Sequence, residues 1–137
     1  MNTIPMTLQH ALEMKDECGI SIPNDGRGIV IEENGRELAK VLCCNFTENS
    51  CFVHMVIRDP KVLERNFLAN EIFRFTFETM KRTMLLATAS SLNEGSLALQ
   101  RAYGFEEVCR ITDAFSNGED MVISRLTRDE YQKRRAH

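Results

Sequence analysis

The segment from Met84 to Thr112 constrains the fold most strongly, because it carries the signals of a complete strand, helix and strand unit. Residues Met84–Ala89 form a short apolar run of the length expected for a buried strand. The segment Ser90–Asn93 follows and contains N-cap candidates for a helix. A helix from Glu94 to Tyr103 then places its apolar residues on one face, and Gly104 provides a left-handed stop. The sequence therefore predicts a buried strand, a capped helix and a second strand in immediate succession.

Upstream of this unit, three β-like runs predict an antiparallel meander. They cover Gly28–Glu33, Glu37–Phe46 and Cys51–Ile57, and the first two are joined at Asn34-Gly35, a strong hairpin signal. Asp59 and Pro60 then suit the start of a helix that we expect to run to about Lys81. Its apolar residues wrap more than one narrow stripe. The helix is therefore either deeply sandwiched or partly covered by a second subunit, in a homodimer or larger assembly.

The two ends of the chain complete the predicted elements. We expect a short edge strand, an amphipathic helix ended by Gly19 and a loop near the N-terminus, at Asn2–Thr7, Leu8–Cys18 and Ser21–Gly28. After Gly104 we expect two strands hinged at Asn117-Gly118 and a capping box that starts a terminal helix, at Glu106–Thr112, Asp120–Leu126 and Thr127–Glu130.

Length and composition favour one α+β domain over residues 1–137. The chain has 137 residues, of which 43% are hydrophobic, which is enough for one core. No apolar run approaches the roughly 18 residues of a membrane span, and no signal peptide is expected at the N-terminus. The five cysteines form no CxxC pair, which favours a reduced, cytoplasmic setting.

The sequence gives no support to metal or nucleic-acid binding. No cysteine or histidine pair has the spacing of zinc ligands, and Cys43 and Cys44 are neighbours that point to opposite faces of a strand. The basic cluster Lys133–Arg135 is a short terminal run in a chain whose net charge is -3. A solvated tail is the simpler reading of that cluster.

The predicted unit resembles the C-terminal half of the GNAT acyltransferase superfamily. The residues that carry the likeness are Asn93, Ser96, Gly104 and Phe105. A closer likeness, from about Cys51 to Tyr131, is to small members that are often phage-encoded. The resemblance implies a single α+β domain with a mixed, mostly antiparallel twisted sheet of about 6 to 7 strands, 3 to 4 flanking helices and two splayed central strands.

The same resemblance implies that acetyl-CoA enters the gap between the splayed strands. Its arm would lie along the strand that ends at Val56 and Ile57, and its phosphates at the loop Arg58–Asn66. Family members usually carry glycines in this loop, and this chain has none there. Arg58, Lys61 and Arg65 can bind phosphate through their side chains, or they are solvated charges at the start of a helix.

Three residues are candidates for catalysis. His54 lies on a strand that would line the gap and can act as a base near neutral pH, although a structural histidine is the plainer reading. Asn93 can contact the cofactor or the acceptor, or it only caps the following helix. Gln100 stands seven residues after Asn93, where many family members carry a tyrosine acid. It can donate a hydrogen bond but no proton, and we expect Tyr103 to point from a different helix face.

Two functions follow from the resemblance. The first is acetyl-CoA-dependent transfer of an acyl group to an amine of a protein or small molecule. The second is a non-catalytic, phage-encoded structural or host-interaction protein that has lost cofactor binding and acts in the host cytoplasm or the virion. The glycine-free loop and Gln100 favour the second. The unit from Asn93 to Phe105 supports both equally, because it mainly specifies architecture.

Overall fold

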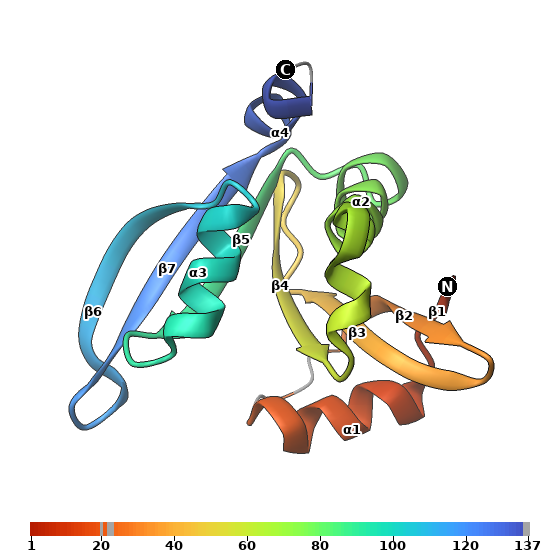
Figure 1. The fold of residues 1–137 in the computed structure, drawn as a ribbon. Coiled ribbons are helices and arrows are strands. Elements are labelled where there is room, and N and C mark those ends of the chain that lie inside the picture. Colours follow the sequence, from red (N-terminus) through yellow and green to blue (C-terminus); the bar gives the residue numbers. More distant parts are fainter. Residues whose placement is uncertain (20, 22–23, 136–137) are drawn as a thin grey trace.

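The computed structural model describes residues 1–19, 21 and 24–135 and has an α+β fold built on a seven-stranded sheet (Figure 1). The strands follow the order β1-β2-β3-β4-β5-β7-β6. They span Asn2–Pro5 (β1), Arg27–Glu33 (β2), Arg36–Cys44 (β3), Ser50–Ile57 (β4), Met84–Ser90 (β5), Glu106–Ser116 (β6) and Glu119–Thr127 (β7). The helices are Leu8–Cys18 (α1), Phe67–Phe73 (α2), Glu94–Ala102 (α3) and Arg128–Arg135 (α4). The predicted fold class and the succession β5, α3, β6 are confirmed.

The turns, caps and helix ends that short sequence motifs predicted are present in the structure. Asn34 and Gly35 both have positive φ and turn β2 back onto β3. Thr127 Oγ1 accepts a hydrogen bond from the backbone N–H of Glu130 at 3.1 Å, and the backbone N–H of Thr127 donates to the Glu130 carboxylate at 3.4 Å, which makes the predicted capping box. Gly19 ends α1 in the left-handed conformation. The predicted loop Ser21–Gly28 lies partly outside the described residues, and its last two residues belong to β2.

The predicted helix from Pro60 to Lys81 is wrong in its first part and in its last. Pro60–Asn66 form a 3₁₀ helix that is interrupted at Glu64 and Arg65, α2 begins only at Phe67, and Arg74–Thr79 form a π-helical turn. Val62 and Leu68 are both fully buried. In one continuous α-helix these two positions would lie about 120° apart around the axis. The interruption lets both of them reach the same core.

The main core lies between the sheet and the helices α2, α3 and α4. Buried residues of β2 to β5 pack there against Leu68, Ile72 and Phe73 of α2. Three aromatic rings pack together there: Phe73 of α2 contacts Tyr103, the C-cap residue of α3, and Tyr131 of α4 at centroid distances of 6.0 and 4.4 Å. The apolar stripes of the α2 segment are therefore covered within the chain, and the predicted homodimer stays a prediction.

On the opposite face of the sheet, α1 is attached through a charged side chain. Lys40 of β3 is completely buried, and its Nζ lies 2.7 Å from a carboxylate oxygen of Glu17 and 3.2 Å from one of Glu13, both on α1. Glu37 lies at 3.5 Å from the same Nζ. Among the described residues, no helix is long and apolar enough to cross a membrane. The cytoplasmic location stays a prediction.

Candidate functional site

The central strands β4 and β5 are paired over only their first residues. They run parallel, and their register covers Ser50 with Met84, Cys51 with Leu85 and Phe52 with Leu86. Beyond Phe52 and Leu86 the two strands separate, as Figure 1 shows between α2 and α3. A cleft of about 1130 Å³ opens in this gap and is lined by residues of α1, β4, β5, α3, β6 and β7. The predicted splaying of the central strands is confirmed.

The edge of β4 that faces the cleft carries backbone groups without a β5 partner. The N–H of Arg58 donates to the carbonyl oxygen of Leu38 on β3 at 2.8 Å. Because successive residues of a strand direct their N–H and C=O groups to alternate sides, Met55 and Ile57 direct theirs away from β3, beyond the last pair of β4 with β5. This row of donors and acceptors suits an extended ligand with amide groups, which would bind as an added strand.

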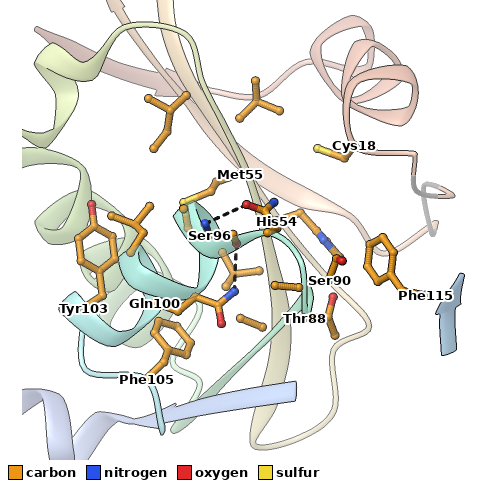
Figure 2. A pocket seen from close by; sticks show the side chains of 18 of the residues that line it. Cys18, His54, Met55, Thr88, Ser90, Ser96, Gln100, Tyr103, Phe105 and Phe115 are labelled. Atoms are coloured by element: carbon orange, nitrogen blue, oxygen red, sulfur yellow. Dashed lines mark hydrogen bonds between the residues drawn. The ribbon is translucent and has the colours of Figure 1, made fainter. Parts of the chain in front are cut away.

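His54 lies on the face of β4 that is opposite to the α2 core. Val53 and Met55 belong to that core, and His54 alternates with them. Figure 2 shows His54 among Thr88 and Ser90 of β5, with Cys18 and Phe115 beyond them. Burial lowers the pKa of His54 below its ordinary value of 6.5. Its imidazole is therefore neutral at pH 7 and can accept a proton.

Gln100 and Tyr103 both line the other side of the cleft, from α3 (Figure 2). The expectation that Tyr103 points from a different face was wrong, because residues three apart on a helix are neighbours. Gln100 is only 8% exposed; its Nε2 donates to Ser96 Oγ over a long 3.4 Å, and its Oε1 has no partner among the described residues. Burial raises the pKa of Tyr103 to about 12, which makes this phenol a weak acid.

Asn93 lies both at the N-cap of α3 and in the wall of the cleft. Its Oδ1 accepts a hydrogen bond from the N–H of Ser96 at 3.1 Å, so it is the N-cap of α3. It also lines the cleft, at the end where β5 leads into α3. The capping role is confirmed by this bond. Contact of Asn93 with a cofactor or an acceptor stays a prediction.

Two carboxylates are the charged side chains among the described residues of the cleft wall, and neither was a sequence candidate. Glu17 lies at the end of α1, and Glu119 lies at the start of β7. Ser90 Oγ donates to Glu119 at 2.7 Å. Hydrogen bonds from Ser90 and Ser116 lower the pKa of Glu119, which is therefore ionised at neutral pH. The Asn117-Gly118 turn was the only local signal near Glu119, and it indicated a hairpin rather than a site.

The cations of the predicted phosphate loop make ion pairs within the chain. Arg58 Nη2 lies 2.8 Å from Glu17 Oε2, and Arg58 also binds Glu37. Lys61 Nζ lies 2.6 Å from Glu33 Oε2. Val56 and Ile57 line the cleft, whereas Arg58, Lys61 and Arg65 do not belong to its wall. Phosphate binding by these cations therefore stays a prediction, and it requires that they exchange or share their carboxylate partners.

The same loop adopts a backbone conformation that usually belongs to glycine. Arg65 has φ 54° and ψ 29°, and Asn66 has φ 57° and ψ 28°. Left-handed conformations cost a residue with a Cβ atom about 1 kcal/mol or more, less for asparagine. The N–H groups of an anion-binding nest converge where residues of opposite hand follow one another, whereas Arg65 and Asn66 are both left-handed. The loop thus holds a strained turn at the position where glycines are expected.

We expect Arg65→Gly to stabilise the protein by about 1 kcal/mol, because glycine adopts positive φ without a steric penalty. Chemical denaturation monitored by circular dichroism measures this gain. Arg101→Gly in α3 is the matched control and should destabilise by about 1 kcal/mol, because Arg101 is exposed within a regular helix. A loss of stability in Arg65→Gly would mean that side-chain contacts of Arg65 outweigh the backbone strain.

The fold is shared with solved acetyltransferase structures. The spermidine/spermine N-acetyltransferase SpeG from Vibrio cholerae matches with a TM-score of 0.69 and 16% sequence identity, over 93% of this chain and 79% of that one. A GNAT-family acetyltransferase from Bacillus anthracis matches with a TM-score of 0.60 and 12% identity, over 77% and 68% of the two chains. A structure described as a probable acetyltransferase gives 0.64 and 16%, over 90% and 70%.

At the level of sequence, no protein-family model and no curated protein matches this chain. The likeness is therefore one of architecture. It extends over most of the chain.

Proposed function

Because the chain has the fold of the GNAT acetyltransferases, we propose that it transfers the acetyl group of acetyl-CoA to an amine in the cleft between β4 and β5. The observation that carries this proposal is the early separation of the two strands after Phe52 and Leu86. The resulting volume of about 1130 Å³ lies just above the range of typical ligand sites, about 300 to 1000 Å³. A structural core would have closed this gap with strand pairing or side chains.

The residues of the cleft fit the arm of acetyl-CoA. The free edge of Met55 and Ile57 offers backbone hydrogen bonds to its amide groups, and Arg58, Lys61 and Arg65 lie in the loop where its phosphates would bind. When it is bound, the cofactor supplies an acyl thioester. The chain's own residues orient that group and the acceptor.

The acceptor enters on the face that carries His54. Glu119, which has no cationic partner among the described residues, makes this part of the wall negative, which attracts a cationic amine and disfavours an anionic acceptor. Glu17 contributes little to this field, because Lys40 and Arg58 already neutralise it. His54, which is neutral, would take the proton that the amine loses. Since the neighbour SpeG is a spermidine/spermine N-acetyltransferase, polyamines are the first acceptors to test. Other small amines and protein amines remain in the same substrate class.

A second candidate function is ligand or partner binding without catalysis. The observation that favours it is the engagement of Arg58 and Lys61 in ion pairs, next to a loop without glycine. Such a protein would keep the architecture and lose the affinity for phosphate. If this alternative holds, acetyl-CoA does not raise the melting temperature of the protein.

We expect acetyl-CoA to raise the melting temperature of the protein. A ligand that binds only the folded state stabilises it by about 2.7 kcal/mol at a concentration 100-fold above its Kd. Thermal melts with acetyl-CoA up to millimolar concentration measure this shift. Ser96→Phe, which places an aromatic ring into the cleft wall, is the control and should show little shift (Figure 2). An unchanged melting temperature in the wild type would favour the non-catalytic alternative.

A further inference from the structure

Gln100 is a buried polar residue whose hydrogen bonding is incomplete. Its side chain is 8% exposed, and Oε1 is shielded from solvent without a partner among the described residues. The opposite end of the carboxamide contacts Ser96 Oγ at 3.4 Å, beyond the usual range for an N–H···O bond. Buried amide oxygens in folded proteins are nearly always paired. The exception here lies in the wall of the cleft.

The surroundings of Gln100 indicate what the missing partner is. Figure 2 shows the carboxamide between Phe105 and Ser96, on the α3 side of the cleft, while His54 and Ser90 lie on the other side. The carboxylates of Glu17 and Glu119 belong to the α1 and β7 ends of the wall. A cationic amine gains most near Glu119, because Lys40 and Arg58 already neutralise Glu17. A neutral N–H donor suits the mostly apolar surroundings of Gln100.

We propose that Gln100 is a cofactor-binding residue whose Oε1 accepts a hydrogen bond from an amide N–H of the acyl-CoA arm. This inference rests on the proposed acetyl-CoA-dependent function. The terminal torsion of glutamine is soft, so a small rotation exposes Oε1 to the cleft while Ser96 holds the other end. The protein thus keeps an unpaired acceptor that only the bound ligand satisfies.

A ligand-binding role of Gln100 and a purely structural role predict different effects of its replacement. If the role were purely structural, Gln100 would stabilise the protein in the absence of ligand. In Gln100→Leu the unpaired buried oxygen is replaced by hydrocarbon of similar size. We expect its melting temperature without ligand to rise by about 3 to 5 °C. Its affinity for acetyl-CoA, measured by calorimetry, should fall about tenfold. Gln132→Leu is the matched control in α4, where the side chain is exposed, and should change neither quantity appreciably.

Gln100→Glu tests which end of the carboxamide binds the ligand. A carboxyl group keeps an acceptor oxygen in either protonation state, so this variant should keep the affinity for acetyl-CoA within about threefold. Equal losses in Gln100→Glu and Gln100→Leu would mean that the amide N–H₂ contacts the ligand, and the proposal would be overturned. The same holds if Gln100→Leu binds as tightly as the wild type or melts at a lower temperature without ligand.

Calorimetry distinguishes a failure of the acyltransferase function from a failure of the role of Gln100. If the wild type binds no acetyl-CoA in the calorimeter, the acyltransferase function fails and the role of Gln100 falls with it. If the wild type binds acetyl-CoA and Gln100→Leu binds it equally well, only the role of Gln100 is wrong. Circular dichroism of each variant checks that the fold is kept before the affinities are compared.

Discussion

Replacing His54 with glutamine should lower kcat for amine acetylation by about 100-fold or more and leave the fold intact. A positioned base contributes about 10² to 10⁴ to the rate of such a reaction. Glutamine has a similar size and keeps hydrogen-bonding capacity, but it cannot take up a proton near neutral pH. His54 is half-buried in the cleft wall, and no described residue donates a hydrogen bond to its ring. Steady-state kinetics with acetyl-CoA and a polyamine measure the loss.

The pH dependence provides a second readout for His54. Burial lowers the pKa of His54 below 6.5, so the base form predominates above that pH and is lost as the pH falls through the shifted pKa. The wild-type rate should therefore level off as the pH rises above 6.5 and decline as the pH falls below it. An arylamine acceptor whose own pKa lies below about 5 isolates this limb, because the acceptor does not then titrate in the same range. The limb should be absent from His54→Gln.

His10→Gln is the matched control, since it makes the same substitution outside the cleft. His10 completes the capping box of α1 with Thr7, and glutamine at that position can make the same contact. Its kcat and pH profile should equal those of the wild type. If His54→Gln retains the wild-type kcat and the acidic limb, His54 is a structural residue and the proton leaves the amine by another path.

Local sequence signals predicted those parts of the fold that are decided over a few residues. The Asn34-Gly35 turn, the Gly104 stop and the Thr127 cap each act within a short segment, and each formed as predicted. The separation of β4 from β5 was reached through resemblance to a family rather than from a local pattern. A parting of strands depends on what both strands pair with elsewhere in the sheet.

Long-range packing decided what the sequence could not predict. The break between Val62 and Leu68 arises because one core requires both side chains. Glu119 and Phe115 enter the cleft wall only because β6 and β7 return alongside β5. The burial of Lys40 could not be predicted either, because a lysine in a β-like run is expected to lie on the exposed face of the sheet. Its charge partners on α1 are more than 20 positions away.

Replacing Lys40 with alanine should destabilise the protein by about 4 kcal/mol. The substitution removes a completely buried side chain, leaves a cavity under α1 and takes the shared cation away from Glu13, Glu17 and Glu37. Lys40→Met fills the same space without a charge and should cost less, about 2 kcal/mol, because the carboxylates on α1 can turn toward water. Urea denaturation at pH 7 measures both values. Lys15→Ala, an exposed lysine of α1, should change stability by less than about 0.5 kcal/mol.

The pH range of this stabilisation follows from the charges. Desolvation lowers the pKa of Lys40, but hydrogen bonds to Glu17 and Glu13 and the charge of Glu37 outweigh it and place the pKa above 10.5. The stabilisation of the fold by the charge of Lys40 is therefore complete below pH 10.5. It is lost as the pH rises through the shifted pKa of Lys40. The hydrogen bond from Lys40 lowers the pKa of Glu13, so the glutamate contribution is present above pH 4.5 and is lost as the pH falls through the shifted value.

Acid should therefore reverse the order of the wild type and Lys40→Met. Once the glutamates are protonated, the wild type keeps a buried ammonium group without a charged partner, whereas methionine has no charge to desolvate. In urea denaturation at pH 7, Lys40→Met should be less stable than the wild type. At pH 3.5 or below, it should be the more stable of the two. Equal stability differences at the two pH values would mean that Lys40 contributes through packing alone. The position of α1, and with it Glu17 at the cleft, would then not depend on charge.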